Sequence, residues 1–167
     1  MKTTLFVLTL LAGFCFGPAA SAQVSAAETQ ALAKQLAQLM HNPHKPRQDV
    51  YLKLSGCHAE QVIRDRDADV QTSKPLAVSY NSGSSGWAVK MDDGVFEMKL
   101  AFEWADVTSL TYAPDTDDDG QKHYQIKIKK SRKGSSMSFD LALYTTNEAT
   151  VKDVVRRLEK LRQSCGR

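Results

Sequence analysis

The last part of the chain, residues 145–165, has its apolar side chains at spacings of three and four. Such spacing places them on one face of a helix, with the charged residues between them on the opposite face. Asn147 alone, or Thr145 together with Glu148, can cap the start of this helix. The pattern therefore predicts an amphipathic C-terminal helix. Its apolar face consists of Val151, Val154, Val155, Leu158, Leu161 and Cys165.

Between residues 50 and 143 the apolar positions recur at every second residue, which is the period of a strand with one buried face. The strongest run is 96–104, where five large apolar side chains share one parity and charged residues or alanine share the other. A helix would scatter those five side chains around its circumference. Asp93-Gly94 is a signal for a tight hairpin. The predicted strands are 50–54 with a continuation through 62–63, then 76–80, 87–91, 96–104, 107–112, 124–128 and 137–143.

A second helical pattern lies near the start of the chain, at 25–40. Ser25 and Glu28 have the spacing of a capping box. We therefore expect a helix and linker over 23–48, followed by the main domain over 49–167. The helix either packs on the main domain or stands away from it as a partner-binding arm. Its narrow apolar stripe consists of Leu32, Leu36, Leu39 and Met40.

Strands joined by hairpins and followed by a helix are typical of an α+β fold. One helix covers only part of a sheet of about seven amphipathic strands, so the sheet has to curl and cover part of itself. We therefore predict a bent antiparallel sheet or a partly open barrel of about seven strands. The C-terminal helix closes this sheet, and the N-terminal helix precedes it.

The first residues differ in composition from the rest of the chain. Residues 1–22 combine a positive charge at Lys2, an apolar run and an Ala-Ser-Ala sequence that ends at Ala22. These are features of a cleavable signal peptide, and the apolar run is too short to span a bilayer comfortably. Cys15 would be the lipid-attachment residue of a lipoprotein, but bulky Phe14 stands where a small residue is needed. We expect a protein that is periplasmic or secreted after cleavage near Ala22.

The net charge and the cysteine content restrict the class of partner and the compartment that we expect for the protein. The chain has 22 Lys and Arg against 19 Asp and Glu, a formal net charge of +3, which does not favour a nucleic-acid partner. Outside the signal peptide, Cys57 and Cys165 form an even pair in an oxidising compartment, which predicts a disulfide bond. The bond would close a loop of about 108 residues and, in the chain-entropy model, would contribute roughly 4–5 kcal/mol to stability.

The order of predicted elements resembles the pleckstrin-homology-like superfold, in which a bent seven-stranded antiparallel barrel is closed by a C-terminal helix. The resemblance covers about residues 50–165 and rests on element order and on the run 102–107 before a short strand. The chain is also similar to small exported bacterial proteins of unassigned function with an early Gly-Cys pair and a helix ending in cysteine. Gly56-Cys57 and Cys165 occupy those places. The superfold mostly implies binding of lipid headgroups or peptides, although a fold alone does not fix function.

The acidic turn that precedes the strand 124–128 carries aspartates at alternate positions. Asp115, Asp117 and Asp119 match positions 1, 3 and 5 of a calcium-binding loop, with a glycine at the sharp turn. Position 12, which supplies a bidentate glutamate in such loops, is Ile126. Any calcium site here would therefore be weak. The alternative is a solvated acidic hairpin tip.

Basic residues gather in and after the strand 124–128. A strand end and turn with several cations is a place where a phosphate group or an anionic membrane surface could bind. The alternative is a charged outer face that protects a sheet edge from aggregation. The cluster consists of Lys127, Lys129, Lys130, Arg132 and Lys133.

Motifs for catalysis and for metal binding are missing from the sequence. It contains no nucleophile-elbow, zincin or P-loop motif, and its four histidines show no metal-ligand spacing. We therefore expect no enzymatic activity and no cofactor, apart from weak calcium. The sequence favours an exported domain that binds a protein or peptide partner or the cell envelope. Two alternatives are a calcium-stabilised binding module and an inhibitor of an envelope or host hydrolase.

Overall fold

The computed structural model describes residues 24–132 and 134–166. The predicted signal peptide, with Cys15 and the cleavage site near Ala22, lies outside the described residues, as does Lys133 of the basic cluster. The described chain forms two α-helices, eight strands and one short 3-10 helix. Their bounds are α1 Ala26–Leu39, β1 Gln48–Ser55, β2 His58–Asp65, β3 Leu76–Ser82, β4 Ser85–Asp92, β5 Val95–Glu103, η1 Trp104–Asp106, β6 Val107–Thr116, β7 Lys122–Arg132, β8 Ser135–Leu143 and α2 Glu148–Cys165.

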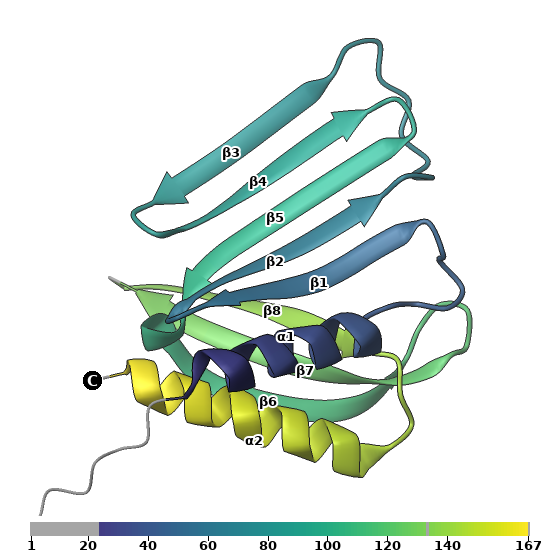
Figure 1. Ribbon diagram of the computed structural model, residues 1–167. Helices are drawn as coiled ribbons and strands as arrows, with labels where there is room; N and C mark the ends of the chain where they lie inside the picture. The colour runs from purple at the N-terminus through teal and green to yellow at the C-terminus, as the bar shows by residue number, and fades with distance from the viewer. Residues whose placement is uncertain (1–23, 133, 167) are drawn as a thin grey trace, which may run out of the picture.

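The strands form two antiparallel sheets (Figure 1). The five-stranded sheet has the order β1-β2-β5-β4-β3, and the three-stranded sheet has the order β6-β7-β8. The two helices contact each other, and Lys160 Nζ of α2 lies 3.4 Å from Glu28 Oε1 of α1. Figure 1 shows both helices beside the three-stranded sheet and β1, with β3 and β4 extending away from them. The helices therefore lie at the β1 end of the five-stranded sheet and leave its β3 end uncovered.

The predicted α+β class, the antiparallel strands and both helices are confirmed. The strands do not close into a barrel, because the chain divides them between two sheets. It turns back at Gly56, where φ is 57°, so that β1 and β2 form a hairpin instead of one continued strand. The 3-10 turn that starts at Trp104 then ends β5, and β6 begins the second sheet. The structure therefore has one strand more than predicted, because the expected continuation of the first strand through 62–63 is the separate strand β2.

Helix α1 belongs to the hydrophobic core. Its predicted capping box is present: the Ser25 hydroxyl accepts from the Glu28 N–H at 3.1 Å, and the Ser25 N–H donates to the Glu28 carboxylate at 3.0 Å. Leu32, Leu36 and Met40 are fully buried, and the helix packs mainly on β1. It therefore packs on the main domain and does not stand away from it as an arm.

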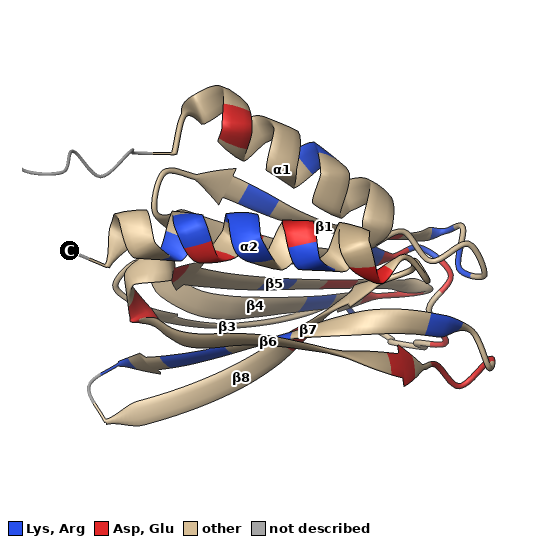
Figure 2. Cartoon of the chain, turned by 90° about the horizontal axis from the view of Figure 1, so that it is seen from below, with Lys and Arg blue, Asp and Glu red and all other residues tan. Residues whose placement is uncertain are grey.

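Helix α2 covers the inner face of the three-stranded sheet. Asn147 caps it, because its side-chain oxygen accepts from the Thr150 N–H at 3.2 Å. The face turned away from the core carries the charged residues (Figure 2), and Lys152 Nζ lies 3.0 Å from Glu148 Oε1 one turn earlier. Apolar side chains from the helices and both sheets form one core. Its fully buried members include Phe102, Trp104, Ile126, Ile128, Leu141, Leu143, Val151, Val154 and Leu158.

The predicted disulfide between Cys57 and Cys165 is confirmed, and the two Cα atoms lie 5.5 Å apart, a normal separation for a disulfide. It joins the β1–β2 turn to the last residue of α2. Trp104 is fixed beside it, since the backbone N–H of Trp104 donates to the Cys57 carbonyl at 2.9 Å. The bond therefore ties the five-stranded sheet to the helix that ends the fold. Within the described residues, neither helix has the length and apolar character needed to cross a membrane.

Candidate functional site

The apolar face of the five-stranded sheet continues beyond the core to its free edge at β3. The strand register places Val78 opposite Val89 and Tyr80 opposite Trp87. Residues that pair in this way point to the same side of the sheet, and the apolar side chains of β5 continue the same rows. The rows end in solvent, where the exposed fractions are 51% for Leu76, 47% for Val78 and 58% for Tyr80.

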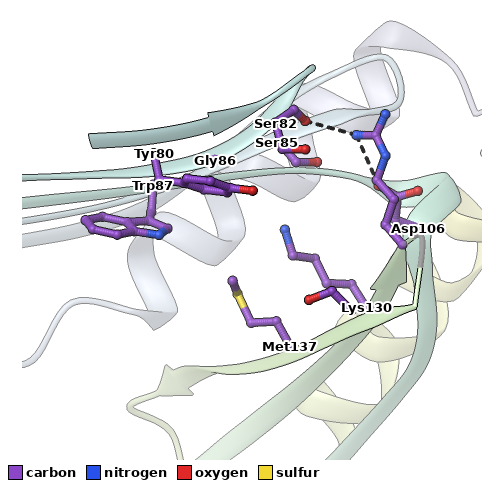
Figure 3. A pocket seen from close by; sticks show the side chains of 10 residues that line it. Tyr80, Ser82, Ser85, Gly86, Trp87, Asp106, Lys130 and Met137 are labelled. Carbon is purple, nitrogen blue, oxygen red and sulfur yellow. Dashed lines mark hydrogen bonds and ion pairs between the residues drawn. The ribbon is translucent and has the colours of Figure 1, made fainter. Parts of the chain in front are cut away.

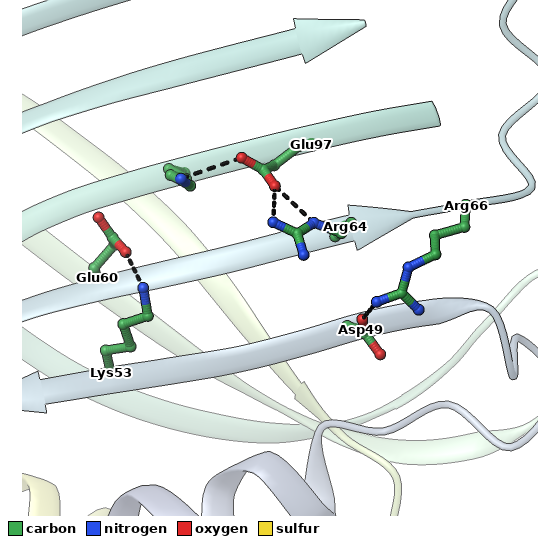
Figure 4. A network of polar contacts seen from close by, with 7 residues as sticks. Asp49, Lys53, Glu60, Arg64, Arg66 and Glu97 are labelled. Atoms are coloured by element: carbon green, nitrogen blue, oxygen red, sulfur yellow. Dashed lines mark hydrogen bonds and ion pairs between the residues drawn. The ribbon is translucent and has the colours of Figure 1, made fainter. Parts of the chain in front are cut away.

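The opposite face of this sheet is charged (Figure 4). Arg64 Nε donates to the Glu97 carboxylate at 2.7 Å, and Lys99 Nζ lies 3.1 Å from the same carboxylate. The hydrogen bond from Arg64 lowers the pKa of Glu97 most, burial opposes the shift, and Lys99 adds to it. Lys53 and Glu60 form a further pair at 2.9 Å. These ion pairs suit a solvated face, so the two sides of the sheet differ in chemistry.

A cavity of about 320 Å³ lies where the apolar face meets the β7–β8 hairpin (Figure 3). This volume is at the lower end of the range for small-molecule sites, roughly 300–1,000 Å³. Tyr80 and Trp87 supply its apolar wall from β3 and β4, and Met137 supplies one from β8. The other lining residues are Ser82, Ser85, Gly86, Asp106, Lys130, Arg132 and Ser135.

Arg132 joins the two sheets at one end of the cavity. Its Nη1 donates to the Ser82 carbonyl at 3.2 Å and lies 3.8 Å from Asp106 Oδ2. Gly83, in the β3–β4 turn, has a φ of 66°, and a Cβ there would lie 3.3 Å from the guanidinium. The positive φ at this position favours glycine, and the missing side chain leaves space for the guanidinium of Arg132. The charge of Arg132 is balanced by Asp106.

Lys130 points into the cavity (Figure 3). Among the described residues its ammonium makes no hydrogen bond or ion pair, and burial lowers its pKa, with Asp106 opposing the shift and Arg132 adding to it. Ser85 is only 8% exposed, and its hydroxyl also lacks a described hydrogen-bond partner. The cavity thus holds an unpaired cation and an unpartnered hydroxyl.

The structure divides the predicted basic cluster between two faces of β7. Lys127 and Lys129 are exposed, with a parity opposite to that of the buried isoleucines of the strand. Lys130 and Arg132 have the other parity and line the cavity. Because alternate residues of a strand point to opposite faces, these side chains do not form one surface. The described members of the cluster therefore form two pairs, Lys127 with Lys129 on the outer face and Lys130 with Arg132 at the cavity.

The predicted calcium loop lies at the β6–β7 hairpin, at the end of the sheet opposite the β7–β8 hairpin (Figure 2). Asp117 Oδ1 accepts from the N–H groups of Asp119 at 3.1 Å and Gln121 at 2.8 Å, which closes the turn. Asp115 lies 3.8 Å from the ring of His123. No three Asp, Glu, His or Cys side chains among the described residues are grouped to hold a metal ion. Calcium binding therefore stays a prediction, and the visible role of Asp117 is in the turn.

The cavity is the part of the site that the sequence did not reveal. Its walls come from β3, β4, β7 and β8, and only the fold brings these strands together. Trp87 is half-buried at the cavity wall, whereas Trp104 is fully buried in the core. One signal was present: the sequence contains more amphipathic strands than its helices can cover.

Comparison of the chain with models of known protein families, with curated proteins and with solved structures finds no match. The resemblance to the pleckstrin-homology-like superfold therefore stays a prediction. Function has to be inferred from three features of the described residues, which are the uncovered apolar face, the free edge of β3 and the cavity that contains Lys130.

Proposed function

We propose that the protein is an exported, non-enzymatic binding domain that holds an extended apolar segment of a protein partner along the edge of β3. The observation that carries this proposal is the uncovered apolar row Leu76, Val78 and Tyr80, of which about half is exposed. A contiguous apolar patch on a soluble protein commonly marks an interaction surface. Covering it would remove apolar area from water, at about 25 cal/mol per Å².

An extended segment fits β3 because this strand is the edge of its sheet. Edge strands carry unpaired backbone groups, and proteins commonly protect them with charges, proline or bulges. Residues 76–82 contain no proline and no charged side chain. A partner strand would continue the backbone ladder and place alternate apolar side chains beside Val78 and Tyr80.

We propose binding rather than catalysis because a hydroxyl nucleophile needs a base within hydrogen-bond reach, about 2.6–3.2 Å. Ser85 is the buried hydroxyl of the cavity, and it makes no hydrogen bond to Lys130 or to any other described residue. Lys130 is therefore not placed to remove the proton of the Ser85 hydroxyl. Their arrangement supports recognition of a ligand better than chemistry on it.

Export is part of the same proposal. The disulfide between Cys57 and Cys165 is compatible with an oxidising compartment, and the composition of residues 1–22 agrees with a signal peptide. We therefore expect the partner in the cell envelope or outside the cell. Its binding segment should be extended, with apolar residues at every second position.

Selection from a library of random displayed peptides, with the protein as target, tests the proposal. Enriched peptides should carry apolar residues at alternate positions, because one face of an added strand meets the protein. Val78→Lys places a charge in the middle of the apolar row. It should weaken binding of the enriched peptides at least about tenfold, equivalent to about 1.4 kcal/mol.

The matched control is Ala77→Lys. Ala77 is also exposed and is the neighbour of Val78 in β3, but it points to the opposite face of the sheet. Its substitution should leave peptide affinity within about twofold. Enrichment of peptides without alternation, or equal losses in the two variants, would show that the apolar row is not the binding surface.

A further inference from the structure

Lys130 is a cation that lacks an anion within the described part of the molecule. The one carboxylate among the described cavity residues, Asp106, already lies 3.8 Å from Arg132 Nη1. Burial lowers the pKa of Lys130, because its charged form is poorly solvated in the cavity. A charge in such surroundings gains more from an opposite charge than one in open water does. The cavity therefore favours an anion beside Lys130.

Ser85 is a second and independent polar group on the same cavity. It is 8% exposed, and its hydroxyl has no described partner, although a buried unsatisfied group costs roughly 1–3 kcal/mol. Next to it, a Cβ on Gly86 would lie 2.3 Å from the Tyr80 carbonyl, so the two strands approach closely here. The hydroxyl oxygen itself is enclosed by protein atoms, so Ser85 belongs to the cavity wall and Lys130 supplies the contact for an anion.

The rest of the cavity is apolar on two sides. Figure 3 shows the rings of Tyr80 and Trp87 on one side and Met137 on the other, with Lys130 beside Met137, its partner in the register of β7 and β8. An inorganic ion would leave these side chains facing water. The walls instead suit a molecule whose charged group is attached to an apolar body, and 320 Å³ is enough for a small ligand of this kind.

We infer that this cavity binds a fatty-acid-like carboxylate, with the head group at Lys130 and the alkyl chain between Trp87 and Met137. The inference goes beyond the proposed function, because it assigns a small amphipathic ligand to the cavity and not a partner strand to the edge of β3. The two surfaces meet at Tyr80, which is exposed on β3 and also lines the cavity.

Titration with decanoate, followed by tryptophan fluorescence, tests the ligand class. Trp87 should report binding, because it lines the cavity while Trp104 is fully buried in the core. Decanol and decylamine share the chain but lack the negative charge, and each should bind at least about tenfold more weakly. Acetate has the charge without the chain and should give no saturable change. Equal affinity for decanoate and decanol, or for decanoate and acetate, would overturn the inference.

Lys130→Met removes the charge and keeps an unbranched apolar side chain. It should weaken decanoate binding at least about tenfold. Lys129→Met is the matched control, because Lys129 is its neighbour in β7 and is exposed on the outer face. Wild-type affinity in Lys130→Met would contradict the site, and so would an equal loss in Lys129→Met.

A measurement on the unaltered protein covers the case in which a variant fails to fold. Acetylation of lysines, read by mass spectrometry, should be slowed at Lys130 by saturating decanoate and unchanged at Lys129. Acetylation of Lys130 at the same rate with and without decanoate would mean that the carboxylate does not lie beside it. Peptide binding to β3 is unaffected by that result, so the two proposals fail separately.

Discussion

Glu97 is the buried carboxylate on the charged face of the five-stranded sheet. The hydrogen bond from Arg64 holds its folded-state pKa below the ordinary value of 4.5. A lowered folded-state pKa contributes stability above the unfolded pKa, and this contribution is lost as pH falls through the folded pKa. Glu97→Gln should therefore lower the free energy of unfolding by about 1–2 kcal/mol at neutral pH. In urea unfolding, the difference from wild type should shrink as pH falls below 4.5.

Glu60→Gln is the comparison for this prediction. Glu60 pairs with Lys53, whose side chain is 57% exposed, and pairs of this kind contribute between about 0 and 1 kcal/mol. The loss in Glu60→Gln should be the smaller of the two. A Glu97→Gln loss that does not change with pH would show that the Arg64 contact is not what stabilises the carboxylate.

Asp117 gives a residue-scale test of the calcium hypothesis. Since its side chain accepts two backbone N–H groups in the β6–β7 turn, Asp117→Ala should lower the unfolding free energy by about 1 kcal/mol. We expect the same loss with and without calcium. Thermal melts in millimolar calcium and in chelator measure this. A calcium-dependent rise of the melting temperature that disappears in Asp117→Ala would instead establish a metal site.

At the scale of elements, α1 is the segment whose role the sequence left open. Leu36 is fully buried in the shared core, so Leu36→Ala should lower the unfolding free energy by about 2–5 kcal/mol. Gln38 lies on the exposed side of the same helix, and Gln38→Ala should change stability by less than about 0.5 kcal/mol. Equal effects in urea unfolding would mean that α1 is a detached arm.

The helices and strands were largely predictable because each has a local period. Five large side chains of one parity identify 96–104 as a strand, and the spacing in 145–165 identifies α2. The division of the strands between two sheets was not predictable in the same way, because it depends on which strands stop forming hydrogen bonds with each other. The hairpin at Gly56 and the 3-10 turn at Trp104 decide this, and neither has a strong local signal.

At the scale of the whole molecule, the disulfide joins the first hairpin to the last helix over a sequence separation of 108 residues. In the chain-entropy model, a loop of this length contributes roughly 4–5 kcal/mol. Replacing Cys57 and Cys165 by serine together should therefore lower the unfolding free energy by about that amount in urea. Secondary structure by circular dichroism should be retained in the absence of urea. An unchanged urea midpoint would show that α2 is held without the bond.

The candidate site was only partly predictable, and the reason is its scale. Lys130 and Arg132 could be named from the sequence as cations, but Ser85 and Trp87 become their neighbours only through the packing of two sheets. The prediction of one basic cluster also left out the alternation of side chains along β7, which places Lys129 on the outer face. The fold therefore places the sequence neighbours Lys129 and Lys130 on opposite faces of β7 and brings Lys130 and Trp87, which are far apart in the sequence, to one cavity.

The proposal that β3 receives a partner strand is tested most directly by hydrogen exchange of its backbone amides, with and without an enriched peptide. In the free protein, half of the amides of residues 76–82 should exchange fast, because an edge strand leaves alternate N–H groups unpaired. Peptide binding should slow these amides, while those of β1 keep their rates. Amides of β3 that are already as slow as those of β5 in the free protein, and that do not change with peptide, would contradict the proposal.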